Sequence, residues 1–182
     1  VVYHNLPYVS NSKLLKLRES PKHCRWYLDN PPIKTQAMKL GTAIHKAILE
    51  PEKFEKEYAI LPEGDGRKKE IKEAREKAMV LYGENCLSPA DYGAIINMSK
   101  AFHSHTFCEK IHSELSSIET TLIWEDPNTN LKCKARVDGI AKSKNYAIDL
   151  KSTVSASPDD FAKSIANYRY HRQAALYVDG MH

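Results

Sequence analysis

The stretch Lys132–Lys151 constrains the fold more than any other part of the chain. From Cys133 to Asp138, small or apolar residues alternate with polar ones, which is the period-two pattern of a half-buried strand. A polar turn at residues 142–145 follows, and Tyr146–Lys151 then resumes the alternation. The stretch therefore predicts two β-strands that pair as a hairpin.

Such a hairpin brings Asp138 and Asp149 together at one end of the sheet, with Lys151 beside them. Carboxylate oxygens suit Mg²⁺, which proteins bind through one or two carboxylates together with a substrate phosphate. A purely structural interpretation is also open, because Asp138-Gly139 is a common turn pair that can simply end a strand. Asp149 and Lys151 can likewise be solvated neighbours on one face. The hairpin alone does not decide between these interpretations.

A further strand is predicted just before the hairpin, at about residues 118–124. The turn residues 126–128 separate it from the next strand. Strands at about 118–124, 131–140 and 145–151 predict an antiparallel meander. Glu119 lies near the start of the first strand, where it either reaches the acidic cluster or occupies an exposed edge.

Helical periodicity and cap residues account for most of the remaining chain. Predicted helices lie at about residues 10–20, 35–49, 67–82, 88–104, 106–114, 157–166 and 170–179. The best-marked start is Ser157, which serves as N-cap with Pro158 in the first turn. Residues 52–66 look irregular. The pattern predicts an α+β fold, with a central, mostly antiparallel three-strand sheet flanked by helices.

Residues 22–27 interleave basic and aromatic side chains. One interpretation is a DNA-contacting segment, since aromatic rings stack on bases and basic groups meet phosphate. The other is a short amphipathic helix that buries Trp26 and Tyr27. Both interpretations remain open at this point.

Two helices carry polar residues at a spacing of one turn. His45 follows Gly41 in the helix at 35–49, where it is either a hydrogen-bonded core histidine or a metal or phosphate ligand. Gln173 and Tyr177 share a face of the last helix, and both can hydrogen-bond DNA. Each pair is compatible with a structural or a functional role.

Length and composition set wider bounds. The 182 residues predict a single domain spanning 1–182, and the 42% hydrophobic and 27% charged fractions are typical of a globular protein. The net charge of +4 is compatible with a polyanionic partner. Neither a membrane span nor a signal peptide is evident, so we expect a cytoplasmic protein without a membrane partner. The start at Val1 resembles a piece cut from a longer chain.

The cysteines and histidines show no familiar metal-binding spacing. Cys24, Cys86, Cys108 and Cys133 are widely separated, which argues against a zinc ribbon and favours reduced thiols. The spacing of His103, His105 and His112 does not indicate a metal site either.

Four short motifs nevertheless occur in a meaningful order: residues 41–45, 137–139, 149–151 and 173–177. They resemble the helical G-x-x-x-H, the two acidic strand motifs and the Q-x-x-x-Y helix of the RecB-like branch of the PD-(D/E)xK nuclease superfamily. The resemblance extends from about Ser10 to the C-terminus. It implies a restriction-endonuclease-like core.

Within this branch the chain is most similar to RecE-type exonuclease VIII of phages and prophages. The similarity lies in the amino-acid sequences of residues 65–68, 134–139 and 170–173. This resemblance implies an ATP-independent 5′→3′ exonuclease that requires Mg²⁺, for which Mn²⁺ can substitute. Its substrate would be double-stranded DNA ends, which it would convert to 3′ single-stranded tails for recombination. A ring-shaped homo-oligomer, usually a tetramer, and a single-strand annealing recombinase as partner are implied as well.

The resemblance also implies residue roles. The metal ligands would be Asp138, Asp149, the Leu150 carbonyl and His45, with Glu119 at their side. Lys151 would orient the attacking water and offset charge on the phosphorane. The DNA strand would be positioned by Arg136, Arg172, Gln173 and Tyr177.

Two departures from the family pattern matter. Iron–sulfur members carry one early cysteine and three late ones; Cys24 lies near the early position but no late group follows, so we predict no iron–sulfur cluster. The family core also continues into another strand after the Q-x-x-x-Y helix, whereas this chain stops at His182, so we expect that strand to be missing. Open alternatives are another RecB-like nuclease of the CRISPR-adaptation type, a non-catalytic DNA-binding module, and an α+β core whose acidic residues are incidental.

Overall fold

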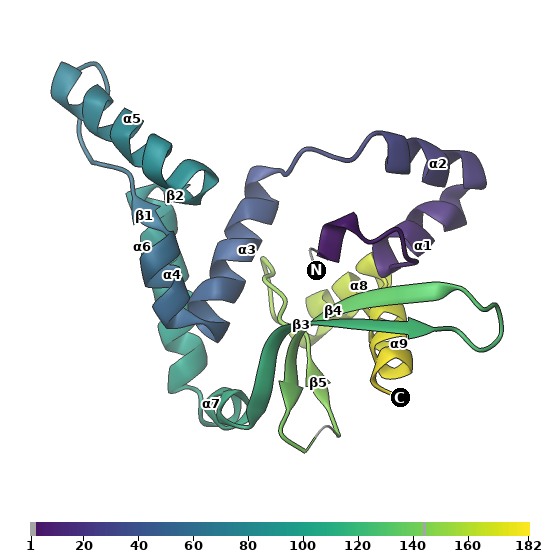
Figure 1. The fold of residues 1–182 in the computed structure, drawn as a ribbon. Helices are drawn as coiled ribbons and strands as arrows, with labels where there is room; N and C mark the ends of the chain where they lie inside the picture. The colour runs from purple at the N-terminus through teal and green to yellow at the C-terminus, as the bar shows by residue number, and fades with distance from the viewer. Residues whose placement is uncertain (1–2, 144) are drawn as a thin grey trace. The chain divides into compact units, whose positions relative to one another are not determined.

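The structure is a computed structural model that describes residues 3–143 and 145–182 (Figure 1). It divides into two compact units. The first, called the sheet unit, comprises the chain up to Ile33 together with Ser116–His182. The second, called the helical unit, is Lys34–Leu115. The mixture of helices with an antiparallel three-strand sheet confirms the predicted α+β class.

The sheet unit contains a short 3₁₀ helix, four α-helices and the three-strand sheet among its described residues. Its elements are η1 (Tyr3–Asn5), α1 (Asn11–Glu19), α2 (Pro21–Asp29), β3 (Leu115–Glu125), β4 (Lys132–Ala141), β5 (Ala147–Ile148), α8 (Pro158–Tyr168) and α9 (Tyr170–Met181). The first residue of β3, Leu115, belongs to the helical unit, and the rest of the strand belongs to the sheet unit. The strand order is β3-β4-β5, the predicted meander.

The last strand is much shorter than the predicted 145–151. β5 pairs antiparallel with β4, with Gly139 opposite Ile148. The backbone N–H of Leu150 donates to the Asp138 carboxylate at 2.7 Å instead of to a strand carbonyl, so the regular ladder ends at Ile148. Lys144, inside the predicted turn, lies outside the described residues.

An N-terminal segment extends the sheet in a way the sequence pattern did not predict. Val9 forms a parallel bridge with Cys133 of β4. The Val9 N–H donates to the Lys132 carbonyl at 2.9 Å, and the Lys134 N–H donates to the Val9 carbonyl at 2.7 Å. The start of β4 therefore has a backbone partner where β5 does not reach.

The side chain of Lys134 binds the N-terminal segment that precedes Val9. The residue is only 4% exposed, and its ammonium donates to the carbonyls of Tyr3 and Leu6, at 2.7 Å each. The Tyr3 ring also lies 4.5 Å from the ammonium. Burial, together with the charge of Lys13, lowers the pKa of Lys134. A buried charge is tolerated only with such compensation, so these contacts tie the N-terminus to β4.

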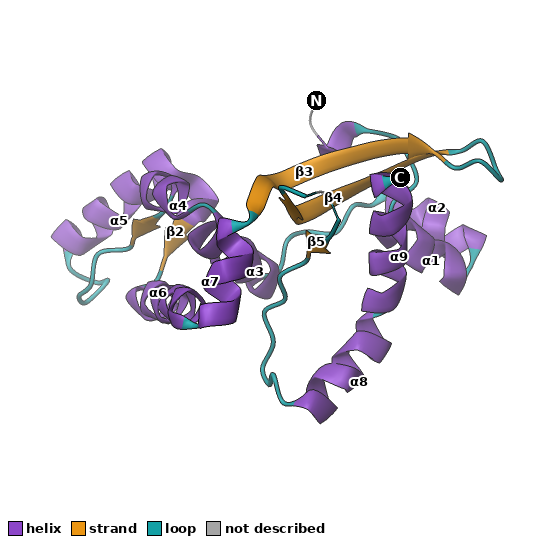
Figure 2. Ribbon diagram, turned by 90° about the horizontal axis from the view of Figure 1, so that it is seen from below, coloured by secondary structure: helices purple, strands orange, loops and turns teal. Residues whose placement is uncertain are grey.

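α9 covers one face of the hairpin, as Figure 2 shows. Tyr177 of α9 is buried with Ala135 and Val137 of β4, so the apolar residues of this strand face inward as its alternation predicted. The strand is more than half-buried, however, because Lys134 and Asp138 on its polar face are buried too. Gly180 lies so close to Trp124 that a Cβ atom there would be 2.8 Å from the indole ring. Glycine allows this close approach of helix and sheet.

The basic and aromatic segment at residues 22–27 is helical, as one of its two interpretations predicted. Its helix, α2, begins at Pro21 and is capped by Ser20, whose hydroxyl accepts the His23 N–H. Trp26 is 64% exposed, so its predicted burial is wrong. α2 packs against α1 by other residues.

The helical unit contains α3 (Gln36–Leu49), α4 (Pro51–Glu57), β1 (Ala59–Ile60), α5 (Lys69–Tyr82), η2 (Gly83–Asn85), β2 (Cys86–Leu87), α6 (Pro89–Ser104) and α7 (Thr106–Ser113). α3 packs against α6 through a buried face that includes Ala43, Ala47 and Ile48. The prediction of irregular chain at 52–66 is wrong for residues 52–60, where α4 and β1 lie, the latter paired in parallel with β2; residues 61–66 contain no helix or strand, as predicted. Two-residue strands are too short to show a periodic pattern.

Several predicted helix starts carry the expected caps. The Ser88 hydroxyl accepts the Asp91 N–H at 3.0 Å, and Ser157 accepts the Asp160 N–H at 3.3 Å. Within residues 3–143 and 145–182, none of the helices is both long and apolar enough to cross a membrane.

Candidate functional site

Asp138 is the most enclosed carboxylate of the predicted site. It lies on β4 with 8% of its surface exposed, and its Oδ2 accepts the Leu150 N–H at 2.7 Å. This bond connects the end of β4 to the chain that leaves β5. It thereby fixes the backbone on both sides of Leu150, including Asp149 and Lys151.

Asp149 follows β5 directly and is held from two directions. Its Oδ1 accepts a hydrogen bond from the Gln173 amide at 3.0 Å and lies 2.9 Å from the Tyr177 hydroxyl. Its Oδ2 forms an ion pair with Lys151. Both groups that contact Oδ1 come from α9, so the helix orients this carboxylate.

The Tyr177 hydroxyl is the centre of this network. It accepts from the Gln173 amide at 2.6 Å and lies 2.9 Å from both the Arg136 carbonyl and Asp149. With one proton, it donates to one of these two acceptors at a time. Burial first, and the Asp149 charge second, raise the pKa of Tyr177 well above 10.0, so the phenol stays a neutral donor. Gln173 and Tyr177 share one face as predicted, and their observed partner is Asp149; their contact with DNA stays a prediction.

Lys151 lies between an acid and an aromatic ring. Its ammonium pairs with Asp149 and is 4.8 Å from the centre of the Tyr170 ring. The side chain is 21% exposed, so solvent still reaches it. Burial is the main cause of a raised pKa at Tyr170, which keeps this ring neutral. The ammonium is therefore balanced by Asp149 while facing an open pocket.

That pocket has a volume of about 670 Å³ and belongs wholly to the sheet unit. Asp149, Lys151, Gln173 and Tyr177 line it together with apolar residues of α8 and α9. Tyr170 also lines it and was not predicted as a site residue. Its spacing supplied a signal, because positions 170, 173 and 177 recur on one face of a helix.

Glu119 has an unusual backbone for a strand residue. Its φ of 51° lies in the left-handed region, which non-glycine residues adopt rarely and at a cost. Its carboxylate is 3.0 Å from the Arg136 guanidinium, and one of its oxygens lies within 4.8 Å of an oxygen of Asp138. The structure therefore places Glu119 beside Asp138.

These oxygen donors fit a divalent cation. Two carboxylates so close together repel each other, and Asp138 is nearly enclosed by protein. A hard cation such as Mg²⁺ takes carboxylate and backbone oxygens as ligands. Asp138 and Glu119 therefore provide oxygen ligands of the right chemistry. Asp149 and the Leu150 carbonyl can add to them, because the Leu150 N–H is bonded to Asp138.

Two further predicted site residues lie on helices. His45 lies on α3, in the helical unit, and its role as a metal ligand stays a prediction. Arg172 donates to the side-chain oxygen and the carbonyl of Asn11, at 3.1 Å each, so it joins α9 to α1. Burial, together with nearby arginines, lowers the pKa of Arg172. Its contact with DNA likewise stays a prediction.

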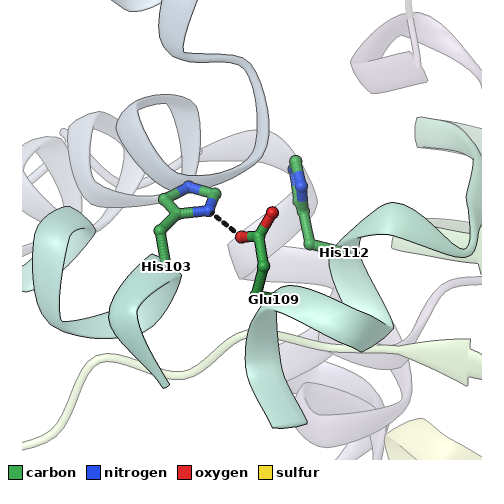
Figure 3. A group of neighbouring side chains, drawn as sticks. All are labelled: His103, Glu109 and His112. Atoms are coloured by element: carbon green, nitrogen blue, oxygen red, sulfur yellow. Dashed lines mark hydrogen bonds and ion pairs between the residues drawn. The ribbon is translucent and has the colours of Figure 1, made fainter. Parts of the chain in front are cut away.

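A second group of possible ligands lies in the helical unit (Figure 3). His103 of α6 meets Glu109 and His112 of α7, with one ligand atom of each within 4.8 Å of the others. The spacing of the histidines had not indicated a metal site, because it omits Glu109 and the turn between the two helices. The one local signal is that Glu109 and His112 are three residues apart on α7.

Most of the chain matches a known family. The family described as a PDDEXK-like domain of unknown function (DUF3799) matches residues 10–182. None of the curated proteins searched matches the sequence.

Proposed function

Because the chain belongs to the PDDEXK-like family, we propose that it is a nuclease whose specific activity is Mg²⁺-dependent, ATP-independent exonucleolytic cleavage of DNA. The single observation that supports this most directly is the fixation of Asp149. Its carboxylate contacts Gln173, Tyr177 and Lys151 at once. A catalytic carboxylate needs this kind of positioning, because small displacements cost large factors in rate.

The residues that would hold the metal are Asp138, Asp149, the Leu150 carbonyl and Glu119, with His45 as a further ligand. When bound, Mg²⁺ lowers the pKa of a coordinated water and polarises the scissile phosphate. Mn²⁺ would serve in the same site because it also prefers oxygen ligands. The protein contributes the orientation of these oxygens.

The remaining side chains act on charge and position. In the free protein Lys151 balances Asp149. Beside a bound phosphate, the same ammonium would orient the attacking water and offset the negative charge that develops in the transition state. Tyr177 and Gln173 would keep the Asp149 carboxylate in place during the reaction. Each is a positioning residue for that acid.

We further propose that the substrate is the end of double-stranded DNA, cleaved 5′→3′ to leave 3′ tails for recombination. This proposal is supported by the resemblance of residues 65–68, 134–139 and 170–173 to RecE-type sequences. Contacts from Arg136, Arg172, Gln173 and Tyr177 to the DNA strand would position it without reading its sequence. A homo-oligomeric ring and a single-strand annealing recombinase as partner belong to the same proposal.

The test is digestion of linear duplexes labelled at either the 5′ or the 3′ end, with Mg²⁺ or with EDTA. The wild type should release the 5′ label first, and only with metal. Asp149→Asn should lose at least about 100-fold in rate. Asp159→Asn, an exposed acid in the first turn of α8, is the matched control and should cleave normally.

Three results would count against parts of this proposal. Normal cleavage by Asp149→Asn would overturn the assignment of the site. Release of the 3′ label first would overturn the polarity but not the nuclease. DNA binding without cleavage in either Mg²⁺ or Mn²⁺ would identify a non-catalytic binding module instead.

A further inference from the structure

The histidine cluster of the helical unit has a geometry that the nuclease chemistry does not use. His103 lies in the last turn of α6, while Glu109 and His112 lie one turn apart on α7. Their ligand atoms all lie within 4.8 Å of one another. The two rings meet edge to face, with centroids 5.0 Å apart. Two helices thus direct two imidazoles and a carboxylate to one point (Figure 3).

His103 is oriented as metal-binding histidines usually are. Its Nε2 lies 3.1 Å from the Ile48 carbonyl, and its Nδ1 lies 2.7 Å from a Glu109 oxygen. A carbonyl oxygen only accepts hydrogen bonds, so Nε2 carries a proton. The lone pair of Nδ1 in the neutral ring then points toward Glu109. Metal-ligating histidines typically donate their second N–H to a carbonyl in this way.

His112 repeats the arrangement with the next carbonyl. Its Nε2 lies 3.5 Å from the oxygen of Leu49, a long contact. Ile48 and Leu49 form the last turn of α3, whose carbonyls have no partner further along the helix. The end of one helix therefore orients both imidazoles, each through its Nε2.

We propose that His103, Glu109 and His112 bind Zn²⁺. Two imidazole nitrogens and one carboxylate oxygen are a common ligand set for zinc, whereas Mg²⁺ prefers oxygen donors alone. In a tetrahedral zinc site the ligand atoms are about 3.3 Å apart, and here they all lie within 4.8 Å of one another. Glu109 is 52% exposed, so a fourth position is open to water.

A competing account needs no metal. A carboxylate and a carbonyl both face His103, and both accept hydrogen bonds, so a doubly protonated imidazole would satisfy them equally well. In that case the cluster caps the C-terminus of α3 by donating hydrogen bonds to its last carbonyls. The two accounts differ in whether the cluster has measurable affinity for zinc.

The experiment measures Zn²⁺ affinity by competition with a chromophoric chelator, using the whole chain. All proteins carry Asp138→Asn and Asp149→Asn, so that zinc at the acidic site does not contribute. On that background, His112→Ala and Glu109→Gln should each weaken Zn²⁺ binding at least about tenfold. His105→Ala removes an exposed neighbouring histidine and should leave the affinity unchanged.

A spectroscopic readout keeps the test independent of folding defects. Cobalt in place of zinc should give the visible absorption of tetrahedral Co²⁺ in the background protein, and Glu109→Gln should lose it while its circular dichroism is unchanged. Equal zinc affinity in all variants would overturn the proposal. So would a site that binds Mg²⁺ as tightly as Zn²⁺. Neither result would bear on the nuclease, which is tested by cleavage.

Discussion

The acidic group of the sheet unit and the histidine cluster of the helical unit hold their donor atoms in different ways. In the sheet unit, Asp149 is fixed by an amide and a hydroxyl from a single helix. In the helical unit, His103 and His112 are oriented by two backbone carbonyls at a helix end. Oxygen donors favour hard cations, and imidazole favours transition metals. If both proposals hold, one small chain offers two chemically distinct sites.

The largest expected effect tests whether the two sites are separate. Asp138→Asn retains an oxygen that can accept the Leu150 N–H but removes a negative charge. We expect Mg²⁺-dependent cleavage to fall by about 100-fold or more, measured on linear duplex DNA. Zinc affinity of the helical unit should be unchanged. A parallel loss of both properties would show that the sites are coupled.

A smaller effect is expected where a residue only positions an acid. Tyr177→Phe removes the hydroxyl near Asp149 and the Arg136 carbonyl but keeps the ring in the core. We expect kcat to fall about tenfold, with little change in the KM for DNA, because the ligand itself remains. The free energy of unfolding should fall by about 1–2 kcal/mol. An effect on KM alone would instead indicate direct contact of Tyr177 with DNA.

The same hydroxyl predicts a pH dependence confined to the sheet unit. The pKa of Tyr177 is raised from 10.0 by burial and by the Asp149 charge, so the folded protein keeps the proton that the unfolded chain releases. Its contribution to stability is complete below about pH 10 and is lost as the pH rises further, by at most about 1.4 kcal/mol per pH unit. Chemical denaturation between pH 8 and 11 should show a steeper loss in the wild type than in Tyr177→Phe, which keeps the raised pKa values of Tyr3, Tyr58 and Tyr170. Identical curves would contradict it.

The smallest expected effect concerns the contact between Arg172 of α9 and Asn11 of α1. Arg172→Ala removes the two hydrogen bonds to Asn11, and we expect unfolding to become easier by about 1 kcal/mol. If Arg172 also contacts DNA, the KM should rise in addition. Asn11→Ala supplies the control, because it loosens the same contact while leaving the arginine available to DNA. Equal KM values in the two variants would argue against a DNA contact.

What the sequence predicted depends on how far apart the interacting residues are. The strand pattern and the order Asp138, Asp149, Lys151 lie in one short stretch, so local alternation was enough to predict the meander. The face shared by Gln173 and Tyr177 followed from helical spacing. Their attachment to Asp149 did not, because it depends on α9 packing against the sheet.

The parts that were not predicted depend on packing between distant elements. The parallel bridge of Val9 with Cys133 joins segments that carry no common pattern. The family resemblance implied a DNA contact for Arg172, which stays a prediction, and nothing in the neighbouring residues indicated its contact with Asn11. The histidine cluster needed the turn between α6 and α7, which brings His103 to Glu109. Hydrophobic periodicity predicts single helices and strands, and it does not predict the contacts between them.

The contact between Lys134 and Tyr3 has a consequence for biosynthesis. The two residues are 131 positions apart, and the helical unit is encoded between them. At ordinary translation rates the ribosome needs about 7–26 s to travel from one to the other. Until the end of that interval the first residues have no β4 to join, whereas the sequence of the helical unit is complete before β4 is made. A fragment that ends at Leu115 should therefore protect the helical unit from protease while the amino-terminal segment is still digested.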